Sequence, residues 1–204
     1  MEYKRLIVLE GIDCSGKSMY AKMLAEHFNK IKFKSREWIH QHEPTFSSED
    51  ADKLNFSGMD TWRREYYFMK DRMNHQVILN SSNTVLDRYI LSGLAYAQVF
   101  SPEAIPMMKS VYSNAAEFMH PDLTFFVDMD PYNALAINDS RKGTPDYNPK
   151  LTLETLEKLR AAFETHLQTM REWELPVMKV QPFFGDIPRT FDSIFNWCDK
   201  SELI

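Results

Sequence analysis

Three short runs of aliphatic or aromatic residues punctuate the chain, and each ends in a charged or glycine-containing turn. They cover Leu6–Leu9, Thr84–Leu86 and Phe125–Val127. Strands that are buried on both faces of a parallel sheet are apolar without alternation, so each run predicts such a strand. Two weaker stretches, Lys34–Ile39 and Val177–Val180, are further strand candidates.

Longer segments with helical spacing separate these runs. The first has its larger side chains at Tyr20, Met23, Leu24, His27 and Ile31. These positions recur every three or four residues, which predicts that they share one face of a helix. The alternation of strands and helices predicts an α/β fold, a doubly wound five-stranded parallel sheet flanked by helices.

Residues 139–150 are polar and contain Gly143, Pro145 and Pro149. This composition predicts an exposed loop, which is either a lid or a simple connection. Residues 151–171 carry charges on one side and Leu, Ala and Phe on the other, as an amphipathic helix does. A chain of 204 residues fits one domain that covers residues 1–204.

The composition places the chain among ordinary globular proteins, with 44% hydrophobic and 26% charged residues. No apolar run approaches the ~20 residues of a membrane span, and we expect no membrane partner. The net charge of −5 gives no basic field for nucleic acid, so we expect no such partner either. Two distant cysteines, Cys14 and Cys198, and the lack of a signal-peptide pattern favour the reduced cytoplasm.

Residues 11–18 carry the clearest chemical signal. They are Gly11, Ile12, Asp13, Cys14, Ser15, Gly16, Lys17 and Ser18. The segment fits the P-loop pattern G-x-x-x-x-G-K-[ST], between a predicted strand and a predicted helix. In such a loop, backbone N–H groups and the helix N-terminus face phosphate oxygens. Lys17 would reach the β and γ phosphates and Ser18 would bind Mg²⁺, so we predict ATP or GTP binding.

Cys14 is an unusual residue inside this loop. A thiol near a helix N-terminus can have a lowered pKa and be reactive. The alternative, which we favour, is a small side chain that only fills space.

Two further elements favour a small-molecule kinase, and the N-K-x-D element of a guanine-reading GTPase is missing from the sequence. Asp87 ends an apolar run and could bind the Mg²⁺ shell, while Arg88 could clamp a phosphate. A surface ion pair is the alternative interpretation of these two residues. Phe68 and Arg72 share a helix face, where one could stack on a base and the other bond its edge. The surrounding stretch Trp62–Met73 could instead be core or a dimer face.

Together these motifs resemble those of thymidylate kinases. The resemblance rests on the P-loop, Phe68–Arg72, Asp87–Tyr96 and Pro121–Asp128, in this order, and extends over nearly the whole chain. It implies transfer of a phosphoryl group from ATP, with Mg²⁺, to dTMP in a homodimeric enzyme.

The resemblance also implies roles for single residues. Phe68 would stack on the pyrimidine, Arg72 would bond O4 of the base, and Arg88 would hold the acceptor's monophosphate. Tyr96 would lie against the 2′ position of the sugar, and Asp13 would lie near the sugar or phosphate. Ser92 belongs to the same motif as Arg88, and we expect it to contact the acceptor.

Four more assignments follow from the resemblance. Glu43 would belong to the acceptor site, and Arg141 would be the lid arginine that closes over the transferring phosphate. Tyr147 would approach the acceptor from the lid, and Gln181 would lie near adenine. We therefore expect a catalytic set that consists of Lys17, Arg88, Arg141 and Asp13.

The chain departs from the family pattern at several positions. His42 replaces an arginine, Ala136 stands where many members have an arginine, and Gly93 replaces a polar side chain that often reads the base. The departures suggest a divergent member, such as a viral one that would act in the host cytoplasm. They leave the base open between thymine, uracil and a modified pyrimidine.

Two other functions compete with this interpretation. A deoxynucleoside kinase would use Glu43 as general base on a 5′-hydroxyl. Such enzymes have a glutamine in the helix that reads the base, whereas this segment reads Phe68-Met69-Lys70-Asp71-Arg72. Their lid also has more arginines, so both features favour a monophosphate acceptor. A non-catalytic, nucleotide-dependent binding protein could instead expose Trp62–Met73 as a recognition surface.

Overall fold

The computed structural model describes residues 4–32, 37–45, 61–114 and 118–200. The elements in chain order are β1 (Leu6–Glu10), α1 (Lys17–Lys30), β2 (Trp38–His42), α3 (Thr61–Leu79), β3 (Asn83–Asp87), α4 (Ile90–Phe100), a 3₁₀ turn (Pro102–Ala104), α5 (Ile105–Tyr112), β4 (Leu123–Val127), α6 (Pro131–Ser140), α7 (Leu153–Glu172), β5 (Val177–Val180) and α8 (Ile187–Lys200).

The five strands form one parallel sheet in the order β2-β3-β1-β4-β5, which confirms the predicted fold class. The order reverses at β1, because the chain adds strands on one side of β1 and then on the other. In such sheets a crevice opens at the carboxyl ends of the strands beside this switch point, and ligands bind there. The loop after β1 is the P-loop.

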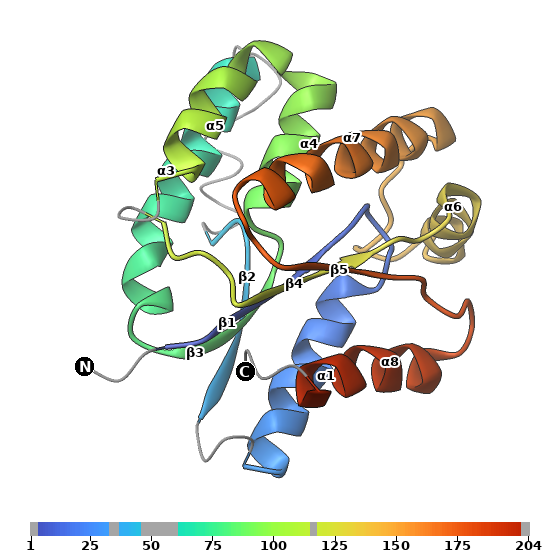
Figure 1. Cartoon of the computed structure of the whole chain (residues 1–204). Coiled ribbons are helices and arrows are strands. Elements are labelled where there is room, and N and C mark those ends of the chain that lie inside the picture. The colour runs from blue at the N-terminus through green and yellow to red at the C-terminus, as the bar shows by residue number, and fades with distance from the viewer. Residues whose placement is uncertain (1–3, 33–36, 46–60, 115–117, 201–204) are drawn as a thin grey trace.

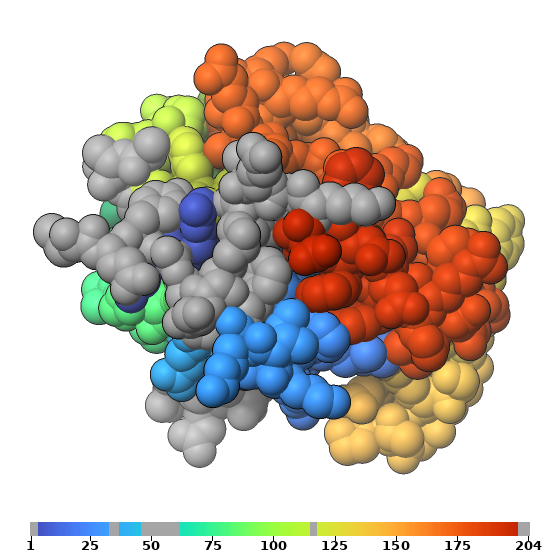
Figure 2. All heavy atoms as spheres, turned by 60° about the horizontal axis from the view of Figure 1, so that its bottom comes forward, coloured from blue at the N-terminus to red at the C-terminus, as the bar shows by residue number. Residues whose placement is uncertain are grey.

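Helices cover both faces of the sheet (Figure 1). Helices α3, α4, α5 and α7 lie on one face, where Leu6 and Val8 of β1 join their core. Helices α1 and α8 lie on the other, where Ile7 and Leu9 of β1 are buried. Figure 2 shows this second face, with α8 in red beside α1 in blue. Alternate residues of β1 therefore pack into the hydrophobic cores on opposite faces of the sheet, which explains its continuous apolar run.

The second strand lies later in the chain than the sequence predicts. We expected it at Lys34–Ile39, but β2 covers Trp38–His42, and residues 34–36 lie outside the described part. β2 is an edge strand that pairs only with β3. An edge strand is less buried than a central one and can contain polar residues such as His40 and Gln41. The search for apolar runs therefore did not detect it at the correct position.

The buried face of α1 also differs from the prediction. Tyr20 and Leu24 are buried as expected, but Ile31 lies beyond the helix and is 46% exposed. The buried face of α1 also includes Ala21, Ala25 and Phe28, which we did not predict to lie on it. The small alanines let the helix approach the sheet closely.

The predicted loop is exposed, but its first two residues form the last turn of α6. The amphipathic helix before β5 is confirmed as α7. Within the described residues, every helix is too short or too polar to span a bilayer.

Candidate active site

The P-loop is a tight turn between β1 and α1. Gly11, Gly16 and Cys14 all have positive φ angles, of 152°, 85° and 60°. A Cβ on Gly11 would lie 2.7 Å from the carbonyl oxygen of Val127, so only glycine fits there. The Ser15 hydroxyl is buried in this turn and has no hydrogen-bond partner among the described residues. A concave turn with an unpaired donor is suited to an anion.

Lys17 begins α1 and is almost fully buried. Its Nζ donates a hydrogen bond to the carbonyl oxygen of Ile12 at 3.1 Å. Burial, together with the nearby charge of Arg88, lowers the pKa of Lys17 to about 8. Asp87 and Asp13 oppose this effect, but among the described residues Lys17 forms no ion pair with a carboxylate, which suits a residue that binds phosphate.

Cys14 does not have the lowered pKa that makes such thiols reactive. Burial raises its pKa, and the neighbouring Asp13 carboxylate acts in the same direction, against the charges of Arg141 and Lys17. The guanidinium of Arg141 lies 3.9 Å from the Cys14 sulfur. The structure therefore favours the space-filling role, and it places the exposed Arg141, which follows α6, against the P-loop.

Asp87 ends β3 beside the P-loop and is fully buried. His42 Nδ1 contacts Asp87 Oδ2 at 2.8 Å, while Asp87 Oδ1 has no hydrogen-bond partner among the described residues. Burial acts to raise the pKa of Asp87, but hydrogen bonds from His42 and Ser18 and the Lys17 charge lower it. An ionised carboxylate with one unpaired oxygen, together with the Ser18 hydroxyl, could supply two of the oxygen ligands that Mg²⁺ takes up beside phosphate.

Arg88 connects the P-loop with α4. Its guanidinium forms a charged hydrogen bond with Asp13 Oδ1 and lies 5.1 Å from the ring centre of Tyr96. The Tyr96 hydroxyl donates to the other oxygen of Asp13 at 2.8 Å. Burial acts to raise the pKa of Asp13, but the charges of Arg88 and Lys17 lower it. The backbone at Arg88 is left-handed, with φ 68°, which a side chain adopts only when its surroundings impose it.

A cavity of about 510 Å³ opens beside this group. It is lined by residues from β2, α3, the end of β3 and α4, namely His42, Glu43, Pro44, Arg64, Glu65, Phe68, Arg72, Arg88, Ser92, Gly93, Tyr96 and Phe100. The volume suits one small ligand. The cavity brings together every residue that we assigned to the acceptor except Asp13, which contacts its wall through Arg88, and Tyr147.

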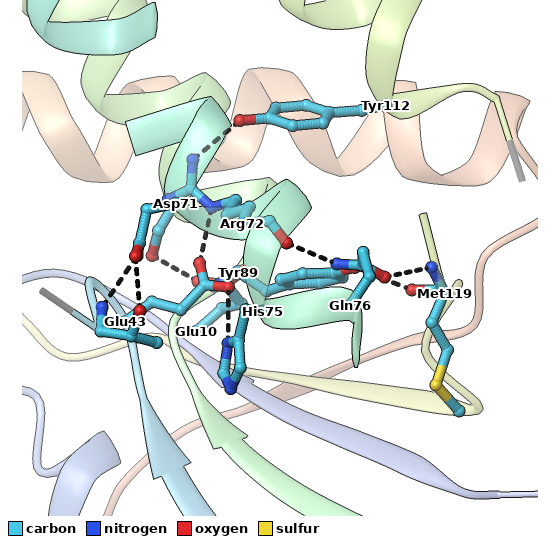
Figure 3. Close-up of polar contacts among 11 residues, drawn as sticks. Glu10, Glu43, Asp71, Arg72, His75, Gln76, Tyr89, Tyr112 and Met119 are labelled. Carbon is cyan, nitrogen blue, oxygen red and sulfur yellow. Dashed lines mark hydrogen bonds and ion pairs between the residues drawn. The ribbon is translucent and has the colours of Figure 1, made fainter. Parts of the chain in front are cut away.

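Arg72 lines the cavity and belongs to a charged network (Figure 3). Its Nε donates to Glu43 at 2.6 Å and its NH1 donates to the Tyr112 hydroxyl at 2.7 Å. His75 Nδ1 lies 3.4 Å from the other oxygen of Glu43. A Cβ at Gly93 would lie 2.6 Å from Arg72 NH1, so this glycine makes room for the guanidinium.

Tyr147 and Gln181 are the two remaining predicted site residues. Neither lines the cavity, and Gln181 is exposed. Their roles remain predictions.

Sequence reasoning missed several residues of the site. Glu10, which bonds the Ser92 hydroxyl, was not singled out, nor were Tyr112 and His75. Arg64 and Glu65 are cavity residues that no motif covers. Only Glu10 carried a local signal, since it is a carboxylate at the end of an otherwise apolar strand. The others depend on how α3 and α5 face each other, which a single sequence does not specify.

The chain resembles known proteins in sequence and in fold. Residues 9–175 match the family model for thymidylate kinase. A thymidylate kinase of Leptospira interrogans is 34% identical over 171 residues, which cover 78% of this chain and 79% of the relative.

Two solved structures share the fold. Thymidylate kinase from Candida albicans has a TM-score of 0.70 at 22% identity, with 98% of this chain and 93% of that chain covered. Deoxyadenosine kinase from M. mycoides, solved with dCMP and dCDP bound, has a TM-score of 0.71 at 12% identity, with 96% and 100% covered. The fold alone therefore does not separate the two kinase classes, but the family model and the sequence relatives do. The chain belongs to the thymidylate kinase family.

Proposed function

We propose that the protein transfers the terminal phosphoryl group of ATP to dTMP and so forms dTDP. The observation that carries this proposal is the position of Arg88. Its guanidinium lines the acceptor cavity and is bonded to Asp13 of the P-loop. A monophosphate held by Arg88 would therefore lie next to the terminal phosphate of a nucleotide in the P-loop.

The chemistry needs positioning and charge more than it needs a base. The acceptor phosphate is already an anion at neutral pH, so no strong base has to remove a proton. The difficulty is that two polyanions must approach each other. Lys17, Arg88 and Arg141 supply three positive charges around the P-loop, and cationic groups of this kind account for much of the catalysis of phosphoryl transfer.

A magnesium ion that enters with ATP would be held by Ser18 and Asp87. The fit rests on the buried Oδ1 of Asp87, which has no hydrogen-bond partner among the described residues. When bound, the ion would neutralise charge on the phosphates. The Asp87 carboxylate is kept ionised and oriented by His42, so the chain's own contribution is a preformed ligand.

Recognition of the base would come from Phe68 and Arg72. Both line the cavity, where Phe68 offers a ring and Arg72 a charged donor to an acceptor edge such as O4 of thymine. Tyr96 closes the wall next to Arg88, where it would lie against the sugar.

The test is ADP formation from MgATP with a panel of acceptors: dTMP, dUMP, dCMP, dGMP, UMP and thymidine. We expect strong turnover with dTMP or dUMP and none with thymidine. Turnover with thymidine but not with dTMP would reject the proposal in favour of a nucleoside kinase.

The contacts of Glu43 also favour the monophosphate acceptor. A nucleoside kinase would need this carboxylate free to take a proton from a 5′-hydroxyl. Here one oxygen accepts from Arg72 at 2.6 Å and the other lies 3.4 Å from His75. The carboxylate is thus occupied in orienting Arg72.

We further propose that two copies of the chain pair through α3. Trp62, Tyr66, Met73 and Val77 are exposed and follow each other at spacings of four, seven and four residues, so they lie on one face of the helix. Sedimentation velocity should give twice the monomer mass for the wild type and the monomer mass for Val77→Glu. A monomeric wild type would refute the dimer.

A cytoplasmic location is also part of the proposal. Cys14 and Cys198 are both free thiols, which suits a reducing compartment. Fractionation of cells that produce the protein, with an assay for dTMP kinase activity in each fraction, tests it.

A further inference from the structure

Glu10 is a buried carboxylate to which the proposed reaction assigns no role. It is the last residue of β1, it is 1% exposed, and it lies under the start of α4. Its Oε1 accepts a hydrogen bond from the backbone N–H of Tyr89 at 3.0 Å. Its Oε2 accepts a short hydrogen bond from the Ser92 hydroxyl. Figure 3 shows Glu10 beside Tyr89, next to the Arg72 network.

These two contacts fall on a helix start that has no cap of its own. Tyr89 is the N-cap residue of α4, and its side chain makes no capping hydrogen bond. The first N–H groups of a helix need an acceptor, and an anion is favoured at this end. The Glu10 carboxylate, although it comes from β1, meets this need.

The same contacts fix the residue before the helix. Arg88 has a left-handed backbone with φ 68°, and its N–H donates to the carbonyl oxygen of Leu9 at 3.0 Å. The next N–H, that of Tyr89, is the one that Glu10 accepts. Two successive N–H groups on the two sides of the strained residue are thus bonded to the end of β1. Without the second bond, the backbone of Arg88 is free to leave the left-handed region.

We propose that Glu10 is a positioning residue for Arg88, which it holds in the strained turn that directs the guanidinium into the acceptor cavity. Glu10 does not contact substrate, and it acts through the backbone. Its effect should therefore appear in the use of the acceptor and leave the use of ATP unchanged. The kinetic part of this inference rests on the proposed transfer to a nucleoside monophosphate.

The ionisation state of Glu10 supports a link between this turn and pH. Burial raises the pKa of Glu10 to about 7, against the lowering effects of the Ser92 hydrogen bonds and the charges of Arg72 and Arg88. The Glu10 charge also raises the pKa of Lys17, but less than the charges of Asp87 and Asp13 do, so ATP use should change little. The ionised carboxylate accepts both hydrogen bonds, whereas a protonated one loses an acceptor site. The turn should therefore be held more firmly above pH 7 than below it.

Two substitutions separate positioning from simple support of the fold. Glu10→Leu removes both acceptors at similar volume, and we expect kcat/KM for dTMP to fall about tenfold while KM for ATP changes less than about twofold. Glu10→Gln keeps an acceptor for the Tyr89 N–H, and we expect it to recover most of this loss. In Glu10→Gln the part of the pH profile with a midpoint near 7 should disappear, although the titration of the dTMP phosphate remains in both enzymes.

Asp128→Asn is the matched control. Asp128 is also a buried carboxylate just after a central strand, but it pairs with Arg160 of α7 and Lys179 of β5. The Asp128→Asn variant should be less stable than the wild type, but its kcat/KM for dTMP should not fall selectively. Equal losses for ATP and dTMP in Glu10→Leu, or the same selective loss in Asp128→Asn, would overturn the assignment.

A readout without substrate distinguishes a failure of this inference from a failure of the proposed function. The ¹⁵N resonance of the Arg88 guanidinium, assigned with Arg88→Lys, should shift with a midpoint near pH 7 in the wild type and should not do so in Glu10→Gln. If the wild type shows the shift but does not phosphorylate dTMP, the function is wrong and the positioning role stands. If the resonance is the same in wild type, Glu10→Gln and Glu10→Leu at every pH, Glu10 does not position Arg88.

Discussion

The donor and acceptor halves of the site are built in different ways. The P-loop takes its shape from eight consecutive residues, and much of its binding surface is backbone. The acceptor cavity takes side chains from β2, α3, the end of β3 and α4, from His42 to Phe100 in the chain. The first half is therefore a local property of the sequence, whereas the second exists only when the fold brings these elements together.

The halves also differ in their electrostatics. On the donor side, the buried Lys17 bonds a backbone carbonyl and forms no ion pair with a carboxylate in the part of the chain that the structure describes. On the acceptor side, Arg72 and Arg88 are each paired with a carboxylate before any substrate arrives. The charge of Lys17 is thus available to bind a phosphate. The carboxylate partners of Arg72 and Arg88 instead hold these two guanidinium groups in fixed positions.

The largest effect should come from removing the unpaired charge. Lys17→Ala should lower kcat by about 10²–10³-fold, because no other side chain in the loop supplies a positive charge to the transferring phosphate. Steady-state kinetics with saturating ATP and dTMP measures it. Lys22→Ala, on the exposed side of the same helix, is the control and should keep wild-type kcat. If kcat of Lys17→Ala is within threefold of the wild-type value, the unpaired charge of Lys17 does not matter for transfer, and the proposed difference between the two halves is wrong.

A paired charge should behave differently when it is lost. Arg72→Ala should raise KM for dTMP about 10–100-fold, since a hydrogen bond to a charged group contributes about 1.5–3 kcal/mol, and should leave KM for ATP unchanged. It also leaves Glu43 buried without its partner, so melting temperatures must be compared.

Arg72→Lys keeps a positive charge opposite Glu43 and separates lost stability from lost recognition. Its KM for dTMP should still rise, because a lysine cannot bond Glu43, Tyr112 and the base together. A wild-type KM for dTMP in Arg72→Ala would exclude Arg72 from base recognition.

The pH dependence should sharpen the contrast further. Because the pKa of Lys17 is lowered to about 8, the ammonium loses its proton as the pH rises through 8, and the neutral amine no longer attracts phosphate. KM for ATP should therefore rise above pH 8, by up to about tenfold per pH unit. The guanidinium groups of the acceptor side do not titrate in this range, so KM for dTMP should not follow. Initial rates at pH 7–9 test this, and an unchanged KM for ATP up to pH 9 would contradict it.

The difference between the halves also explains what could be predicted from the sequence. The P-loop and the central strands were found, since a run such as Leu6–Leu9 is buried on both faces whatever its neighbours are. β2 was misplaced because an edge strand tolerates residues such as His40 and Gln41. Tyr112 could not be predicted, because its role is a hydrogen bond with Arg72, which lies 40 positions away in the sequence.

Glu10 is an instructive case between these extremes. Its position, one residue before the P-loop, was visible in the sequence, and a carboxylate that ends an apolar strand is unusual. Its partners, the Tyr89 N–H and the Ser92 hydroxyl, are 79 and 82 positions away. Local sequence could therefore mark the residue as unusual, but only the sheet could show what it holds.

The smallest effect should come from Cys14, an unusual residue inside the P-loop. Burial raises the pKa of its thiol, so little thiolate is present at neutral pH. If the loop works through its backbone, Cys14→Ala should change kcat by less than about threefold, and alkylation of the wild type should be slow and slower still with ATP bound. Residue 14 has φ 60°, so Cys14→Gly, which relieves this conformation, is the companion variant. A loss in Cys14→Ala as large as that in Lys17→Ala would mean that the sulfur, through its contact with Arg141, is part of the donor site, and that the donor half depends on a distant side chain as the acceptor half does.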